Sequence, residues 1–123
     1  MKFEEGIPIY LQIKEMVENA IISGSLQEEE AIPSIRTLAK DYVVNPQTIS
    51  SAVNELLSED IVFKKRGIGM FVQKGAKAHL IQNKTVQFTE KELVNVVNKG
   101  KALGLSLTEF KEIINKIYEQ GEK

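Results

Sequence analysis

The chain has 123 residues, of which 42% are hydrophobic and 27% are charged, with a net charge of -1, no cysteine and one histidine, His79. This length allows one domain of ordinary size, or a small domain with an appendage, and is too short for a Rossmann dehydrogenase or an α/β-barrel enzyme. Without cysteine and with one histidine, which we read as a surface residue, we expect no disulfide, metal, cofactor or catalytic residue. No apolar run approaches the roughly 18 residues of a membrane span and no signal peptide opens the chain, so a cytoplasmic protein without membrane contact is expected.

Two helices are predicted in the first third of the chain. Apolar residues at helical spacing, followed by Gly24 as a stop, predict a helix over about residues 8–23. The next stretch, 25–33, is acidic and irregular. Ser34 is then a good N-cap for a short helix that ends near Asp41.

A third helix is predicted to begin after a tight turn at about 42–44. Asn45 is a good N-cap, and Pro46 suits the first helical position. Five residues at helical spacing form its apolar side: Ile49, Ala52, Val53, Leu56 and Leu57. The opposite side is uncharged and capable of hydrogen bonding, and consists of Gln47, Ser51, Asn54 and Ser58, flanked by Thr48 and Ser50.

A basic β-hairpin is predicted next, with strands over 61–63 and 70–72 and a turn over 64–69. The net charge of -1 argues mildly against a nucleic-acid binder. Charge is segregated, however, because residues 61–84 hold six basic residues and no acidic one, whereas residues 1–60 have a net charge of -7. The basic turn is either an ordinary solvated hairpin or a phosphate-binding tip.

The remaining sequence predicts a connector and a helical hairpin. Residues 75–88 read as a connector with a short helix around 76–83. Two capping boxes mark helix starts, Thr89 to Glu92 and Ser106 to Glu109, and Gly104 makes the turn between the two helices.

The order of these elements is that of a winged helix-turn-helix domain, followed by a C-terminal αα-hairpin, which gives a mainly α fold with a small β-hairpin wing. We therefore divide the chain into a DNA-binding domain over 1–75 and a helical dimerisation region over 76–123. In this plan the third helix enters the major groove by its N-terminal half. The expected DNA contacts are Ser34, Arg36, Asn45, Gln47, Thr48, Ser50, Ser51, Asn54, Lys64, Lys65, Arg66, Gly67 and Gly69.

The sequence also resembles the DNA-binding domain of GntR-family bacterial repressors over about residues 7–73. Four motifs carry the resemblance in order: Pro8-Ile9-Tyr10 with Gln12-Ile13, Ile32 to Ala39, Val44 to Ile49, and Arg66 to Val72. The tail, with Ala102 to Ser106, resembles the YtrA subfamily, which implies dimerisation by two C-terminal helices. The resemblance implies a sequence-specific DNA-binding regulator, a repressor of a palindromic operator, that acts as a homodimer on double-stranded DNA.

This sequence departs from the family pattern at several positions. Val43 and Asp60 stand where glycine is usual, and Glu28-Glu29 replaces Pro-Gly. Asn54 replaces a frequent arginine, and Pro46 stands where many relatives have arginine. These departures leave fewer cations for phosphate.

The C-terminal apolar residues are expected to form a dimer interface, although they could instead fold back on their own chain. They are Leu93, Val96, Val97, Leu103, Leu107, Phe110, Ile113, Ile114 and Ile117. If a small-molecule effector acts on this protein, it would bind at the dimer interface or the domain junction.

The residues of the DNA-binding domain also allow plainer interpretations. Arg36 could merely pair with Asp41, and the polar side of the third helix could be an ordinary exposed surface. A winged-helix adaptor that binds proteins and no specific DNA would have the same fold, because a fold does not fix a function.

Overall fold

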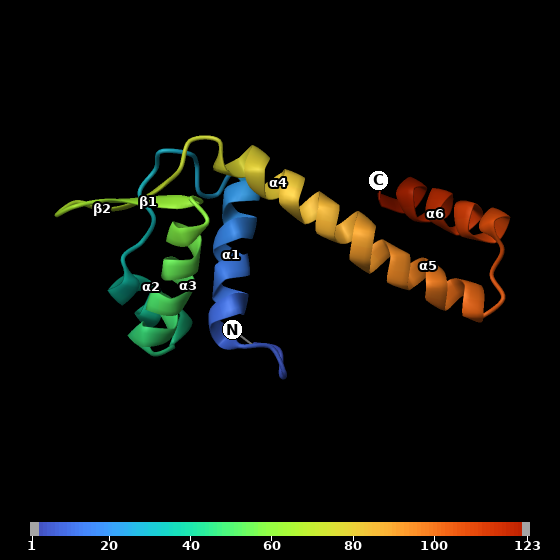
Figure 1. The fold of residues 1–123 in the computed structure, drawn as a ribbon, viewed down its shortest axis with the longest axis horizontal. Helices are drawn as coiled ribbons and strands as arrows, with labels where there is room; N and C mark the ends of the chain where they lie inside the picture. Colours follow the sequence, from blue (N-terminus) through green and yellow to red (C-terminus); the bar gives the residue numbers. More distant parts are fainter. Residues whose placement is uncertain (1–2, 122–123) are drawn as a thin grey trace. The chain divides into compact units, whose positions relative to one another are not determined.

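The computed structural model describes residues 3–121 and divides the chain into two compact units, Met1–Asn83 and Lys84–Lys123 (Figure 1). It confirms a mainly helical fold with one two-stranded antiparallel hairpin. In chain order the elements are α1 (Ile9–Ser23), α2 (Ile35–Tyr42), α3 (Pro46–Ser58), β1 (Val62–Lys65), β2 (Gly69–Val72), α4 (Ala76–Gln87), the π-helical turn η1 (Phe88–Glu92), α5 (Leu93–Ala102) and α6 (Leu107–Gly121).

The predicted helix starts in the first unit are confirmed, with one small shift. The Ser34 hydroxyl accepts the Thr37 N–H at the start of α2, and the Asn45 side chain accepts the Gln47 N–H at the start of α3. Pro46 occupies the first position of α3. Helix α1 begins at Ile9, because Pro8 has the extended ψ of 136° typical of a residue just outside a helix.

The ends of α2 and α3 use left-handed residues that are not glycine. Val43 (φ 55°) follows α2 and Asp60 (φ 59°) comes just after α3. In both places the next residue donates its N–H to a carbonyl five residues earlier, at 3.0 Å, which is the bond of a Schellman motif. The resemblance predicts glycine at these two positions and at Glu29, which has φ 67°. The backbone therefore keeps the conformation that glycine would provide.

The wing is longer and better paired than the sequence predicts. Lys64 and Lys65 belong to β1 and face Met70 and Gly69 of β2, so the turn is shorter than the predicted 64–69. The stretch 25–33, which is predicted to be irregular, pairs with the outer side of β2. Ala31 forms an isolated β-bridge with Phe71, and the Ile32 N–H donates to the Met70 carbonyl at 2.9 Å. This pairing depends on contacts between distant parts of the chain, which local sequence patterns do not reveal.

The core of the first unit has two connected parts. One lies between α1, α2 and α3, where Ile13 and Ile49 are fully buried. The other lies between α1, the C-terminal end of α3, the hairpin and the first two turns of α4, where Leu56, Val72 and Ala76 are buried. Helix α3, the third helix predicted from the sequence, thus packs into both parts of the core, and its remaining side faces away from them.

The predicted capping box at Thr89 is wrong. Helix α4 runs to Gln87 instead of ending near residue 83, and it passes directly into η1 and α5. Gln87 is itself helical, so Thr89 lies inside a helix, where its hydroxyl donates to the carbonyls of Thr85 (2.9 Å) and Val86 (3.3 Å). Inside a helix, a threonine hydroxyl can donate to a carbonyl of the preceding turn. The sequence pattern of a capping box can therefore also occur in the middle of a helix.

The second predicted capping box is confirmed, and it shapes the α5–α6 hairpin. The Ser106 N–H donates to the Glu109 carboxylate at 3.0 Å, and the Glu109 N–H donates to the Ser106 hydroxyl at 3.1 Å. The Ser106 N–H bond, helped by the hydroxyl, lowers the pKa of Glu109. Gly104 makes the turn with φ 90°, and the ring of Phe110 packs against Gly100, where no side chain would fit.

Candidate nucleic-acid interface

The free side of α3 carries the residues predicted to read DNA. Gln47 and Asn54 are exposed, and Thr48, Ser50 and Ser51 are half-buried at its edges. The Ser51 hydroxyl donates to the Gln47 carbonyl at 3.1 Å, whereas Gln47 and Thr48 use no side-chain polar atom within the described part of the chain. The amide of Gln47 and the hydroxyl of Thr48 are therefore available to base edges.

Two other predicted DNA contacts serve as helix caps. Ser34 accepts from the Thr37 N–H at 3.1 Å and donates to the Thr37 hydroxyl at 3.0 Å, and Asn45 accepts from the Gln47 N–H at 2.8 Å. Both side chains remain exposed. They hold the N-terminal ends of α2 and α3, whose unpaired N–H groups favour anions such as phosphate.

The acidic residues at the C-terminal end of α3 are paired with a lysine of α1. Lys14 Nζ lies 2.6 Å from a carboxylate oxygen of Glu59 and 3.5 Å from one of Glu55. Burial lowers the pKa of Lys14, but the hydrogen bond that Lys14 donates to Glu59 and the attraction of the nearby carboxylates outweigh this effect, so the pKa is raised. Lys14 thus offsets part of the negative charge at the C-terminal end of α3.

Arg36 is a free cation at the start of α2. It is exposed, and among residues 3–121 no hydrogen bond or ion pair engages its guanidinium. The ion pair with Asp41 that the sequence also allows is therefore not formed. A guanidinium without a partner can bind a phosphate or a guanine edge through two parallel hydrogen bonds.

The wing presents its cations on a rigid support. Lys64, Lys65 and Arg66 are exposed, and Gly67 (φ 77°) and Gly69 (φ 145°) shape the turn. The rings of Phe63 and Phe71 stack with centroids 5.7 Å apart, and Lys65 Nζ lies 4.8 Å from the Phe71 centroid. Lys65 is thus folded over the aromatic pair, which leaves Lys64 and Arg66 as the unrestrained cations of the wing.

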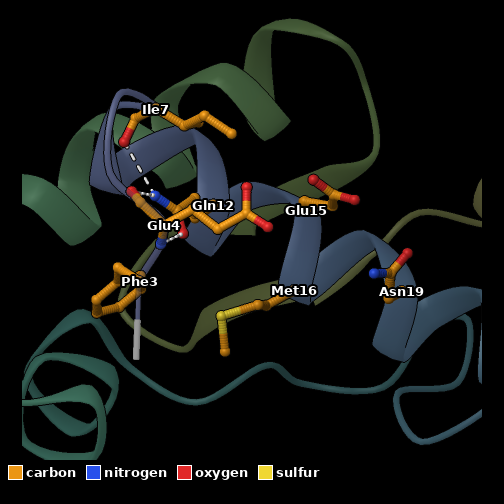
Figure 2. Close-up of a pocket in the computed structure, with 7 residues that line it drawn as sticks. All are labelled: Phe3, Glu4, Ile7, Gln12, Glu15, Met16 and Asn19. Carbon is orange, nitrogen blue, oxygen red and sulfur yellow. Dashed lines mark hydrogen bonds between the residues drawn. The ribbon is translucent and has the colours of Figure 1, made fainter. Parts of the chain in front are cut away.

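A shallow groove of about 320 Å³ lies on α1, away from the apolar side that packs on α3 (Figure 2). The side chain of Gln12 binds Glu4 and Ile7, which folds the N-terminal segment back along the helix. The carboxylates of Glu4 and Glu15 belong to its lining, and no basic residue does. This groove therefore adds no cation to the DNA-reading surface.

Within the second unit, most of the predicted dimerisation residues are exposed. The exposed ones are Leu93, Val96, Val97, Leu103, Leu107, Ile113, Ile114 and Ile117. Phe110 differs, because its ring contacts Gly100 of the same hairpin. Phe88, which the sequence predicts to lie in a connector, is 51% exposed.

Other kinds of site find no support in the described residues. The part of the chain from 3 to 121 contains no group of three or more His, Cys, Asp or Glu side chains placed to hold a metal ion. None of its helices is long and apolar enough to cross a membrane.

Fold and surface together define a winged helix-turn-helix DNA-binding protein. Residues 9–72 match the model of the gntR family of bacterial regulatory proteins. The chain is 31% identical over 110 residues to the HTH-type transcriptional repressor YtrA of Bacillus subtilis, an alignment that covers 89% of this chain and 84% of that repressor. The chain belongs to the GntR family and is a transcription regulator, not an enzyme.

Solved structures agree with this assignment. A GntR-family transcriptional regulator from Listeria monocytogenes superimposes with a TM-score of 0.79 at 28% identity, covering 93% of this chain and 98% of that chain. The DNA-binding domain of AraR in complex with operator ORX1 superimposes with a TM-score of 0.54 at 28% identity, covering 58% of this chain and 92% of that domain. The winged fold of this chain is thus similar to one that has been captured on operator DNA.

Proposed function

We propose that this regulator is a repressor that binds a palindromic operator as a homodimer. The observation that carries the proposal is the N-terminal half of the free side of α3, which is polar and uncharged, in a unit whose Arg36 makes no ion pair within the described residues and whose wing exposes three further cations. A surface helix with no partner more commonly carries Lys and Glu on its outer side. The similarity to a domain crystallised with its operator supports the same placement.

In this proposal α3 enters the major groove by its N-terminal half. Gln47 and Thr48 reach base edges, and Asn54 acts further along the helix. Arg36 binds a phosphate or a guanine. Lys64 and Arg66 contact the backbone, and Gly67 and Gly69 allow the wing to approach it closely or to enter the minor groove.

The homodimer in this proposal forms through the part of the predicted dimerisation region, 76–123, that lies beyond Asn83, because Ala76 and Leu80 pack in the first unit. Gly100 is the one buried residue among 84–121, so the hairpin covers little of its own apolar surface. A surface of this kind on a soluble protein marks an interface. A second copy suits it because a twofold regulator matches a palindromic site.

The π-helical turn η1 extends this surface by bringing Phe88 into line with α5. At 100° per residue, a regular helix would place Phe88 about 110° away from the stripe formed by Leu93, Val96, Val97 and Leu103. In η1 the Leu93 N–H bonds to the Phe88 carbonyl, five residues back. This one-residue expansion removes about 100° of the offset. We therefore add Phe88 to the dimer interface.

A binding assay tests the proposal. Palindromic sequences selected from random DNA with the purified protein are tested by gel shift between about 50 and 200 mM salt, and sedimentation gives the oligomeric state. We expect a dimer that binds a palindrome with a strong salt dependence. A protein that selects no DNA, or binds every fragment equally, contradicts the proposal and favours a protein-binding adaptor.

A further inference from the structure

Helix α4 leaves the DNA-binding unit without a cap of its own. The first N–H groups of a helix need acceptors, which a side chain just before the helix usually provides. That position is Gly75, which has no side chain and adopts φ 86°. The Ala76 N–H finds the Gln73 carbonyl at 3.1 Å, but the N–H groups of Gly75 and Lys77 need another acceptor.

A carboxylate from a distant loop supplies this acceptor. Glu28 Oε1 accepts the Gly75 N–H at 2.8 Å, and Glu28 Oε2 accepts the Lys77 N–H at 3.3 Å. The negative charge also lies at the helix end where the macrodipole favours it. Glu28 is one of the departures from the family pattern, so this clamp is a feature of this chain's own sequence.

The loop that carries Glu28 is itself firmly held. The Glu29 N–H donates to the Val72 carbonyl at 2.7 Å, and the Val72 N–H donates to the Glu30 carbonyl at 3.0 Å. On the other side of the junction, Ala76 and Leu80 are buried in the same apolar cluster as Val72. Gly75 therefore lies between two parts that are held in place, the β2 strand with the Glu28 loop and the start of α4. The hydrogen bonds of Glu28 join these two parts.

We propose that Glu28 is a positioning residue that fixes the direction in which α4 leaves the DNA-binding unit. Through this direction it sets the spacing between operator half-sites to which the dimer binds. This inference rests on the proposed dimer function, because α4 leads into the proposed dimerisation region. Adding one base pair between half-sites moves them apart by about 3.4 Å and rotates one against the other by about 35°. If the angle between α4 and the first unit is fixed, the dimer cannot adapt to this change and binds the altered operator more weakly. If the angle is free to change, both DNA-binding units can still reach their half-sites.

Amide exchange tests the clamp without DNA. In Glu28→Ala the N–H groups of Gly75 and Lys77 are expected to exchange at least about tenfold faster, with the thermal transition of the first unit retained. Glu28→Gln keeps an oxygen acceptor and is expected to restore much of the protection. Glu30→Ala is the matched control, because it removes a neighbouring exposed carboxylate that makes no hydrogen bond or ion pair within residues 3–121. Equal exchange in Glu28→Ala and Glu30→Ala overturns the clamp.

The spacing role is tested on selected palindromes with one base pair added or removed between the half-sites. The wild-type protein and Glu30→Ala are expected to lose about tenfold in affinity on the altered sites. Glu28→Ala is expected to lose less than about threefold, with its affinity for a single half-site unchanged. An unchanged spacing preference in Glu28→Ala, or an equal loss on every site including the half-site, overturns this inference alone. A wild-type protein that binds no palindrome refutes the proposed function as well.

Discussion

Replacing Gly100 by alanine tests the packing of the α5–α6 hairpin, because the packing decides whether the free energy of unfolding falls or rises. A β-carbon at this position would lie 1.9 Å from Phe110 Cζ and 2.5 Å from Phe110 Cε2. Contacts this short cannot be relieved by a small shift, so the ring must leave its place. Helix propensity alone predicts the opposite effect, because alanine in a helix is more stable than glycine by about 1 kcal/mol.

The net change follows from these two terms. Losing a fully buried phenylalanine ring costs about 3–5 kcal/mol. Phe110 is half-buried, so losing its packing costs about 1.5–3 kcal/mol, from which the helix propensity gain of about 1 kcal/mol is subtracted. We therefore expect Gly100→Ala to destabilise the protein by about 0.5–2 kcal/mol per chain and to weaken the dimer. Urea unfolding followed by far-UV circular dichroism at several protein concentrations measures the stability, and sedimentation measures the dimer.

A second background makes the test decisive. With Phe110→Ala already in place, the ring is absent and the same glycine-to-alanine change is expected to stabilise the protein by up to about 1 kcal/mol. The sign of the effect therefore reverses between the two backgrounds. A Gly100→Ala protein that is as stable as the wild type, or more stable, refutes the packing of Phe110 on Gly100.

Three further predictions follow from the backbone and the charge pairs. Val43→Gly relieves a left-handed valine at the cost of a more flexible unfolded chain, so it is expected to raise the unfolding free energy by up to about 1 kcal/mol; a lower thermal midpoint contradicts this. Deleting Glu90 turns η1 into a regular helical turn and keeps Phe88 in line with the apolar residues of α5, so the dimer should be preserved in sedimentation. Deleting Asn95 rotates Leu93 away from Val96, Val97 and Leu103, so the dimer should be weakened. Equal effects of the two deletions contradict the role of η1. Because folding raises the pKa of Lys14 above 10.5, the stability of the wild type relative to Lys14→Met in urea should be constant between about pH 6 and pH 10, where the partner glutamates are ionised, and shrink above pH 10. A difference that grows above pH 10 refutes the ion pairs.

Signals that act over a few residues predicted much of the fold. Ser34, Asn45 and the Ser106–Glu109 box cap helices as expected, because a cap depends on two or three neighbouring residues. Gly24 and Gly104 end helices in the left-handed conformation that their type favours. Thr89 shows the limit of such signals, since the same pattern occurs inside a continuous helix.

Features that depend on distant contacts were not predictable. The pairing of Ala31 with Phe71 and the bonds of Glu28 to the start of α4 join parts of the chain some 40 to 50 residues apart. The packing of Phe110 on Gly100 requires the turn between them to be known in atomic detail. In the candidate site, the residue types on the outer side of α3 were predictable from helical periodicity. The sequence could not show that Lys14 pairs with Glu55 and Glu59, or that Arg36 is left unpaired.

The central claim is that α3 reads the operator, and the ratio of affinities for a selected palindrome and for random DNA tests it most directly. Thr48→Ala is compared with Ser58→Ala, which removes a hydroxyl from the other end of the same helix, where it donates to the Glu55 carbonyl. We predict that Thr48→Ala lowers the ratio by about tenfold or more with an unchanged thermal midpoint, and that Ser58→Ala leaves the ratio at the wild-type value. A ratio that Thr48→Ala leaves unchanged contradicts the account.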